Sequence, residues 1–155
     1  MATSAIPAAI DALLTILRAA DQLEDVVIFD GPPTEEEDAA EILAVGWRGS
    51  EEPGAEGVQD FAYAGARRRD EEFTIGCWLE VWSGDTDFGP VRRRAFELLA
   101  AVEDAIRATG SQPMAPTLNG TVQWGHLTAM SLQQSFTEDG IKAGIPFVVS
   151  CRARI

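Results

Sequence analysis

In two stretches of this sequence every second residue is apolar over ten or more positions. A period of two is the pattern of β-strands that bury one face. Over Glu72–Trp82 one face carries Phe73, Ile75, Cys77, Leu79 and Val81. In the last run, Ile141–Arg154, the same spacing aligns Ile145, Phe147, Val149, Cys151 and Ala153, and Ile155 continues it. Any fold of this chain must therefore contain a sheet that covers these two faces.

The remaining pattern adds two helices and further strands around that sheet. Apolar residues at helical spacing predict helices over Ala5–Ala20 and Phe88–Ala108. Ser4 and the turn Ser83–Asp87 can cap them. Further strands are expected over Val26–Phe29, Ile42–Trp47, Val58–Ala66 and Thr121–Phe136, with Gly49–Gly57 as a loop. This order favours one α+β domain over residues 1–155, with a mainly antiparallel sheet, a long β-hairpin and two helices packed on one face.

Some of the predicted surfaces are more apolar than a monomer needs. Trp78 and Trp82 lie on the face of their strand opposite the core residues. We expect them to pack under a helix or against a neighbouring subunit. The first helix is apolar beyond one stripe, which fits either a contact with another subunit or burial within its own domain.

Negative charge is concentrated in one part of the sequence. Residues 24–60 carry 12 of the 25 acids and one base, Arg48, in a chain of net charge −13. The segment includes Glu35, Glu36, Glu37, Asp38, Glu51 and Glu52. Charge of this density forms a negative zone that repels nucleic acid. A DNA-binding role is therefore excluded, despite the two arginine triplets.

The triplets Arg67-Arg68-Arg69 and Arg92-Arg93-Arg94 are the main basic features. The first lies at the predicted hairpin tip, where acids follow it. The second lies in the first turns of a helix, where the helix dipole disfavours cations. One interpretation is that these arginines meet the acidic zone of an identical neighbour. The other is that they are solvated or paired within the same chain.

Residues for catalysis or metal binding do not form a recognisable pattern. His126 is the only histidine, and it lies in a predicted strand, where a structural role is the usual one. No Cys or His cluster has metal-ligand spacing, no acidic loop has the calcium-loop pattern, and no glycine motif forms a phosphate loop. Cys77 and Cys151 fit buried free thiols. We therefore expect a non-enzymatic protein without cofactor or metal.

No apolar stretch approaches the roughly 20 residues that span a bilayer. The first base is Arg18 and the apolar start is helically patterned, so we expect no signal peptide. Assembly in the cytoplasm follows from these two expectations.

Several segments together resemble tail terminator proteins of long-tailed phages that infect actinobacteria. The resemblance rests on residues 6–14 (IPAAIDALL), 27–33 (VIFDGPP), 66–71 (ARRRDE), 77–85 (CWLEVWSGD) and 145–155 (IPFVVSCRARI). It spans nearly the whole chain, and its specificity lies in the order of these segments because no catalytic motif anchors it.

The resemblance implies an assembly role in the virion. Tail terminators form a ring, usually of six copies, at the head-proximal end of the tail tube, stop its growth and bind head-completion or connector proteins. DNA passes through the centre, so we expect Glu35, Glu36, Glu37, Asp38, Glu51 or Glu52 to face the lumen. Arg67, Arg68, Arg69, Trp78, Trp82, Arg92, Arg93 and Arg94 are the expected subunit contacts.

Two other functions remain open at this point. The chain could be a different neck or tail-completion protein, because such small α+β proteins share folds. It could also be a small ligand-binding or enzymatic domain with a pocket near Trp124 and His126.

Overall fold

Two long strands, β4 (Arg69–Ser83) and β7 (Ile141–Arg154), form the centre of the structure. They pair antiparallel from Asp70 opposite Arg154 to Ser83 opposite Ile141. The computed structural model of the chain describes residues 2–34, 39–65, 67–108 and 112–155. The apolar faces predicted for both strands are buried, so the alternation identified the core correctly.

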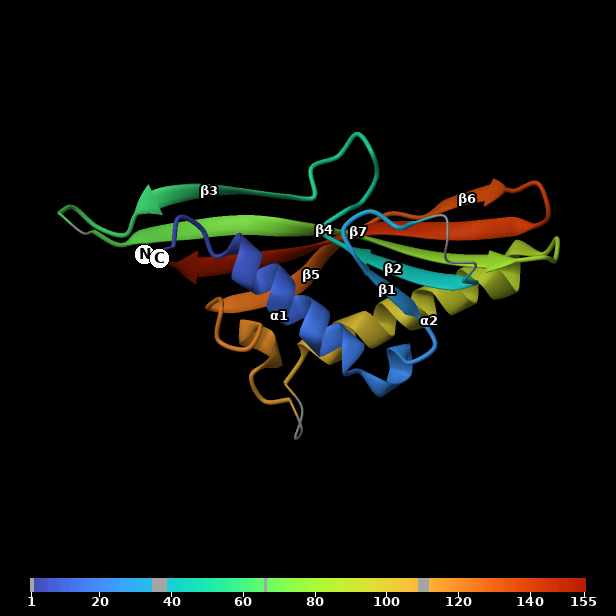
Figure 1. Cartoon of the computed structure of the whole chain (residues 1–155), viewed down its shortest axis with the longest axis horizontal. Coiled ribbons are helices and arrows are strands. Elements are labelled where there is room, and N and C mark those ends of the chain that lie inside the picture. Colours follow the sequence, from blue (N-terminus) through green and yellow to red (C-terminus); the bar gives the residue numbers. More distant parts are fainter. Residues whose placement is uncertain (1, 35–38, 66, 109–111) are drawn as a thin grey trace.

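Shorter strands complete a seven-stranded sheet on both sides of this pair (Figure 1). On the free side of β4, β3 (Ala55–Phe61) pairs with its first half and β2 (Glu41–Val45) with its second. The strand β1 (Val27–Asp30) pairs with β2 and is parallel to it. On the free side of β7, β6 (Gln133–Phe136) and β5 (Trp124–Met130) pair with its first and second halves.

Both α-helices, α1 (Ile6–Arg18) and α2 (Phe88–Ile106), cover the same face of the sheet (Figure 1). Two 3-10 turns, η1 (Asp21–Leu23) and η2 (Ala115–Thr117), lie on that side as well. The predicted α+β class, with a mainly antiparallel sheet and two helices, is confirmed. The apolar face of α1 is buried in this core. None of the described helices is long and apolar enough to cross a membrane.

Several predicted boundaries are wrong. The expected loop Gly49–Gly57 already contains the start of β3, and the hairpin arms run over Ala55–Phe61 and Arg69–Ser83. The run Thr121–Phe136 holds two strands, because Ser131 and Leu132 separate β5 from β6. The helices end at Arg18 and Ile106, two residues earlier than predicted in each case.

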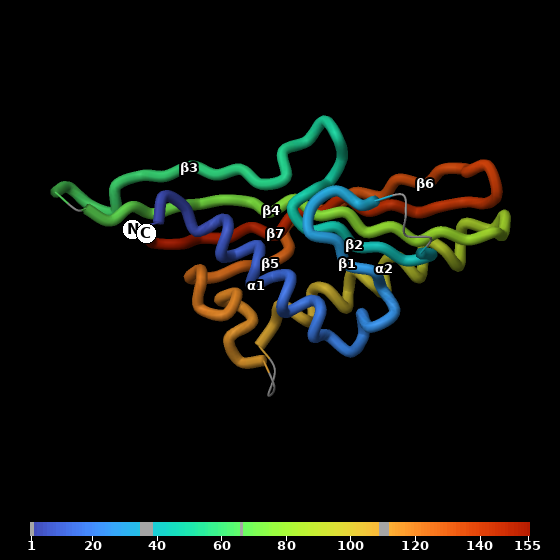
Figure 2. The backbone as a smooth tube through the Cα atoms, viewed as in Figure 1, coloured from blue at the N-terminus to red at the C-terminus, as the bar shows by residue number. Residues whose placement is uncertain are grey.

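The molecule is elongated along β4 and β7, with a hairpin at each end (Figure 2). Residues 62–68 join β3 to β4 at one end, and residues 137–140 join β6 to β7 at the other. Both chain ends lie at the β3–β4 end. There Ile155 and Arg69 exchange backbone hydrogen bonds of 2.9 and 2.8 Å. The face opposite the helices, called here the open face, carries none of the described helices.

Candidate functional site: the open face and edges of the sheet

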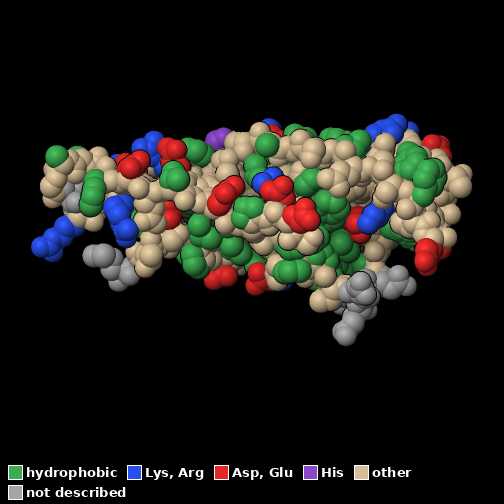
Figure 3. Space-filling view, turned by 90° about the horizontal axis from the view of Figure 1, so that it is seen from above, with side chains coloured by type: hydrophobic (Ala, Val, Ile, Leu, Met, Phe, Trp, Pro, Cys, Tyr) green, Lys and Arg blue, Asp and Glu red, His purple; other side chains and the backbone are tan. Residues whose placement is uncertain are grey.

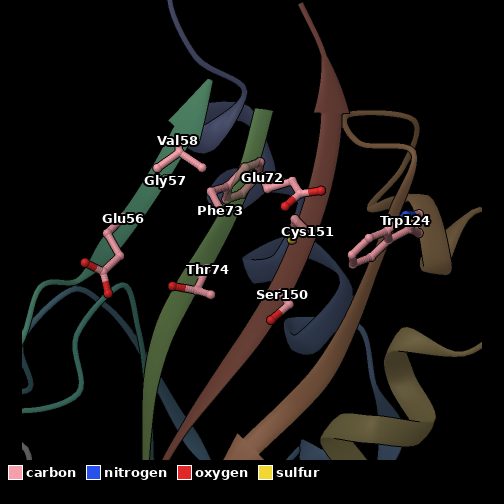
Figure 4. Close-up of a pocket in the computed structure, with 9 residues that line it drawn as sticks. All are labelled: Glu56, Gly57, Val58, Glu72, Phe73, Thr74, Trp124, Ser150 and Cys151. Carbon is pink, nitrogen blue, oxygen red and sulfur yellow. The ribbon is translucent and has the colours of Figure 1, made fainter. Parts of the chain in front are cut away.

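Strand register arranges the open face in rows of side chains. Glu56, Thr74, Ser150 and His126 lie opposite one another across β3, β4, β7 and β5. The next row holds Val58, Glu72, Arg152 and Trp124. A shallow depression of about 480 Å³ lies over these rows (Figure 4). Its walls are Glu56 and Val58 on one side and Trp124 on the other.

The depression does not assemble a nucleophile with a base. The Ser150 hydroxyl lies 2.6 Å from the Thr128 hydroxyl. The exposed His126 ring packs against Trp124 at 4.8 Å between centroids. Among the described residues His126 and Ser150 make no hydrogen bond to each other, so this row lacks the activation that hydroxyl nucleophiles require. The described residues also contain no group of three metal-ligating side chains.

Both cysteines are buried in the core. Burial raises the pKa of the Cys77 thiol to about 12, and it does the same for Cys151. A thiol in that state is a poor nucleophile at neutral pH. The predicted role as small apolar core residues agrees with this environment.

The three arginines of the first triplet lie in different parts of the hairpin. Arg69 begins β4 and donates a 2.8 Å hydrogen bond to Gln59. Arg67 and Arg68 lie in the exposed turn, and within the described chain neither side chain has a hydrogen bond or ion pair. This is notable in a protein with 25 acids and 12 bases. These two side chains are free to bind another molecule.

The second triplet has three different environments. Arg94 holds Glu41 of β2 with two hydrogen bonds of 2.6 and 3.1 Å, so it is paired within the chain. Arg92 donates to Gln134 of β6 at 2.9 Å. Arg93 is exposed and has no polar partner in the described part of the chain. Within the triplet, Arg94 is therefore paired inside the chain, Arg92 contacts β6, and Arg93 is available to another molecule.

The two predicted interface tryptophans also differ. Trp78 is half-buried on the open face, away from both helices, and packs edge-on against Trp47 at 5.9 Å. Its ring also lies where a Cβ on Gly144 would come within 2.5 Å. Trp82 is 37% exposed and donates to Thr137 at 3.2 Å. Neither tryptophan is covered by a helix, and Trp82 is the more exposed of the two.

The predicted acidic lumen is described only in part. Glu35, Glu36, Glu37 and Asp38 lie outside the described residues. Glu51 and Glu52 are exposed in the loop between β2 and β3, which projects away from the helices (Figure 1). Glu52 forms an ion pair with Arg48 at 3.2 Å. Acidic and basic side chains are interspersed over the rest of the open face (Figure 3).

A buried carboxylate that was not predicted from the sequence joins α1, β3 and β4. Glu71 of β4 is 2% exposed. It accepts hydrogen bonds from the Ala5 backbone N–H at 2.8 Å and from Gln59 at 2.6 Å. Ala5 is the N-cap of α1, so this carboxylate satisfies a free N–H at the positive end of the helix. Extending the alternation two residues back from Phe73 would have placed Glu71 on the core face.

A second missed feature is a run without charge. Between Arg107 and Glu138 there is no Asp, Glu, Lys or Arg, although 24% of the chain is charged. This run includes all of β5 and β6, which form one edge of the sheet. Five of its large apolar side chains are exposed: Met114, Trp124, Met130, Leu132 and Phe136.

The opposite edge is apolar as well. Val58 of β3 is 68% exposed, Phe61 is 74% exposed, and Tyr63 lies exposed in the adjoining turn. Together the two edges and their adjoining turns hold seven of the ten large apolar side chains that are exposed in the described chain.

Comparison with known proteins gives a likeness of fold. No protein-family profile matches the sequence, and no curated protein matches it. Among solved structures, a chain of one titled "Virion of native gene transfer agent (GTA) particle" superposes with a TM-score of 0.54. The sequences are 16% identical, and the match covers 99% of this chain and 100% of that chain. The whole of this chain therefore shares a fold with a chain of a virion.

Proposed function

We propose that this protein is a structural component of a phage-like virion, and specifically a tail terminator. In this role copies form a ring that caps the tail tube, stops its polymerisation and offers a surface for joining the head. The observation that carries the proposal is the end-to-end likeness of fold to a chain of the gene transfer agent virion. The segments that resemble those of tail terminators, and their order along the chain, support the more specific role of a terminator.

The surface chemistry supports an assembly role. Arg67, Arg68 and Arg93 have no partner in the described chain, while the chain has twice as many acids as bases. In a ring of identical copies, each cation meets a predominantly acidic neighbour, which favours association and fixes its orientation. Trp82 and the apolar sheet edges add area that can be buried against other copies or other tail proteins.

DNA passes through the lumen of the proposed ring without specific binding. Glu51 and Glu52 are exposed on a projecting loop and are suited to line that passage, together with the acids at 35–38. A negative wall repels the phosphate backbone and prevents adhesion. The tail tube protein binds one face of the ring and a head-completion or connector protein the other, at the head-proximal end of the tail. No cofactor or catalytic step is part of this role.

The proposal is tested by tube assembly. The tail tube protein of the same genome is polymerised with and without this chain, and tube lengths are measured by electron microscopy. We expect short tubes that carry the chain at one end, and overlong tubes when it is omitted. Tubes of unchanged length, with the chain absent from their ends, would overturn the terminator role. Binding at another neck position instead would support the related neck-protein function.

A further inference from the structure

The structure has two free sheet edges that match each other. At the hairpin end the strand order is β3-β4-β7-β5, and β3 and β5 each pair on one side only within the described chain. Each is seven residues long. Three antiparallel steps separate them, so β3 and β5 run in opposite directions. A second copy placed beside β5 in the same orientation therefore brings its β3 antiparallel to β5.

The outer side of β3 presents backbone groups for such pairing. The Ala62 N–H donates to the Arg68 carbonyl at 3.1 Å, and the Gly76 N–H donates to the Gly54 carbonyl at 2.8 Å. These two bonds establish which residues of β3 are hydrogen-bonded to β4. Bonded and non-bonded positions alternate in an antiparallel pair. The N–H and C=O groups of alternate residues from Ala55 to Phe61 thus point away from β4. Unpaired groups of this kind are a template for another strand.

The outer side of β5 lacks the usual protection of an edge strand. Exposed edges are normally guarded by charged residues or proline. From Thr117 to Thr137 the chain contains neither Asp, Glu, Lys, Arg nor Pro. A hollow of about 440 Å³ lies along this edge, between β5 and the end of α2. Four consecutive residues, 124–127, form one wall with their backbone edge, and Pro116 and four residues at the end of α2, namely Glu103, Ile106, Arg107 and Ala108, form the rest.

One exposed side chain of β3 fits this hollow. Phe61 lies on the helix side of the sheet, since it is two residues from Gln59, which bonds to the inward-facing Glu71. In a sheet continued from one copy to the next, the helix sides coincide. The ring of Phe61 would then reach the hollow beside β5, where Ile106, Pro116 and Leu127 offer apolar contacts. The two charged residues of the hollow, Glu103 and Arg107, are paired with each other.

We propose that β3 of one copy pairs with β5 of the next, with Phe61 in the hollow between β5 and α2. The contact joins two different surfaces of identical chains, so it repeats around a ring when the rotation closes. This inference rests on the ring-forming function proposed above and assigns the strands that make the contact.

Engineered cysteines test the pairing directly. The native thiols are buried, so they do not interfere. Val58→Cys is combined in one chain with a cysteine at position 124, 126 or 128 of β5, all on the open face. Within one chain, β3 and β5 are three strand spacings apart, roughly 14 Å. This is far beyond the 7 Å limit for a disulfide. Any bond formed must therefore join two chains.

We expect oxidation of at least one of the three double variants to give a ladder of multimers on non-reducing gels, and mixed single variants to give dimers. The matched control, Val58→Cys with Ala100→Cys on exposed α2, should give no ladder. Ring-sized particles without cross-links at any β5 position would overturn the pairing and leave the ring function standing. Dimers of Val58→Cys alone would show a symmetric contact and also overturn it. A protein that stays monomeric at every concentration would refute both proposals.

A second variant tests the side chain. Phe61→Asp should lower the association constant at least tenfold, because it removes the ring that would contact Ile106, Pro116 and Leu127 and buries a charge in its place. The control Thr15→Asp adds the same charge at an exposed position of α1. Equal association of the two variants would contradict the assigned contact.

Discussion

Glu71 provides the sharpest test of how the hairpin is joined to the rest of the fold. Its carboxylate is buried and accepts one hydrogen bond from the N-cap of α1 and one from β3. Substitution by alanine leaves the Ala5 N–H and the Gln59 amide without their acceptor. Hydrogen bonds to charged groups contribute about 1.5–3 kcal/mol each. Part of this loss of stability is offset, because the variant no longer has to transfer a charged carboxylate from water into the protein interior.

We therefore expect Glu71→Ala to lower the free energy of unfolding by about 2–4 kcal/mol. In a protein of this size the melting temperature falls by roughly 5–15 °C. Urea unfolding followed by tryptophan fluorescence measures the change. The neighbouring Glu72→Ala removes an exposed carboxylate on the open face and should change stability by no more than about 0.5 kcal/mol. If the two variants were equally stable, Glu71 would not be the link between α1, β3 and β4.

Three further predictions concern charge. Arg94→Ala should cost about 1 kcal/mol because its two hydrogen bonds to β2 are lost, whereas Arg93→Ala should be neutral in the same urea titration. Hydrogen bonds from Arg154 lower the pKa of Asp70 below 3.8, so this carboxylate stabilises the fold above that pH. The thermal stability of the wild type should exceed that of Asp70→Asn at pH 7, and the difference should disappear as the pH falls through the lowered pKa. Duplex DNA should not be retained in gel-shift assays at low salt, and tight binding would contradict the repulsive surface.

The long strands could be predicted because one face of each is buried along its whole length. That alternation identified the core face of β4 and β7, and the helical spacing identified α1 and α2. The edge strands were harder to delimit. Most residues of β3 are exposed, so no burial pattern marks where this strand begins and ends. Burial likewise does not mark the break between β5 and β6 at Ser131 and Leu132.

The sequence indicated which types of residue make contacts, but not the partner of each residue. Sequence reasoning grouped Arg92, Arg93 and Arg94 together, but successive helical residues point in different directions. Only Arg94 reaches Glu41, which is 53 residues away in the sequence. The tryptophans show the same limit, because Trp78 is covered by Trp47 from the loop after β2 and Trp82 is not. Such pairings depend on tertiary contacts between distant segments.

The proposed function requires identical chains to join through different surfaces and form a closed ring. Light scattering coupled to gel filtration, over a range of protein concentrations, measures this directly. It should show a species several times the 16.7 kDa chain mass, about 100 kDa for six copies, whose population grows with concentration. A mass of 16.7 kDa maintained at the highest concentration would contradict the account.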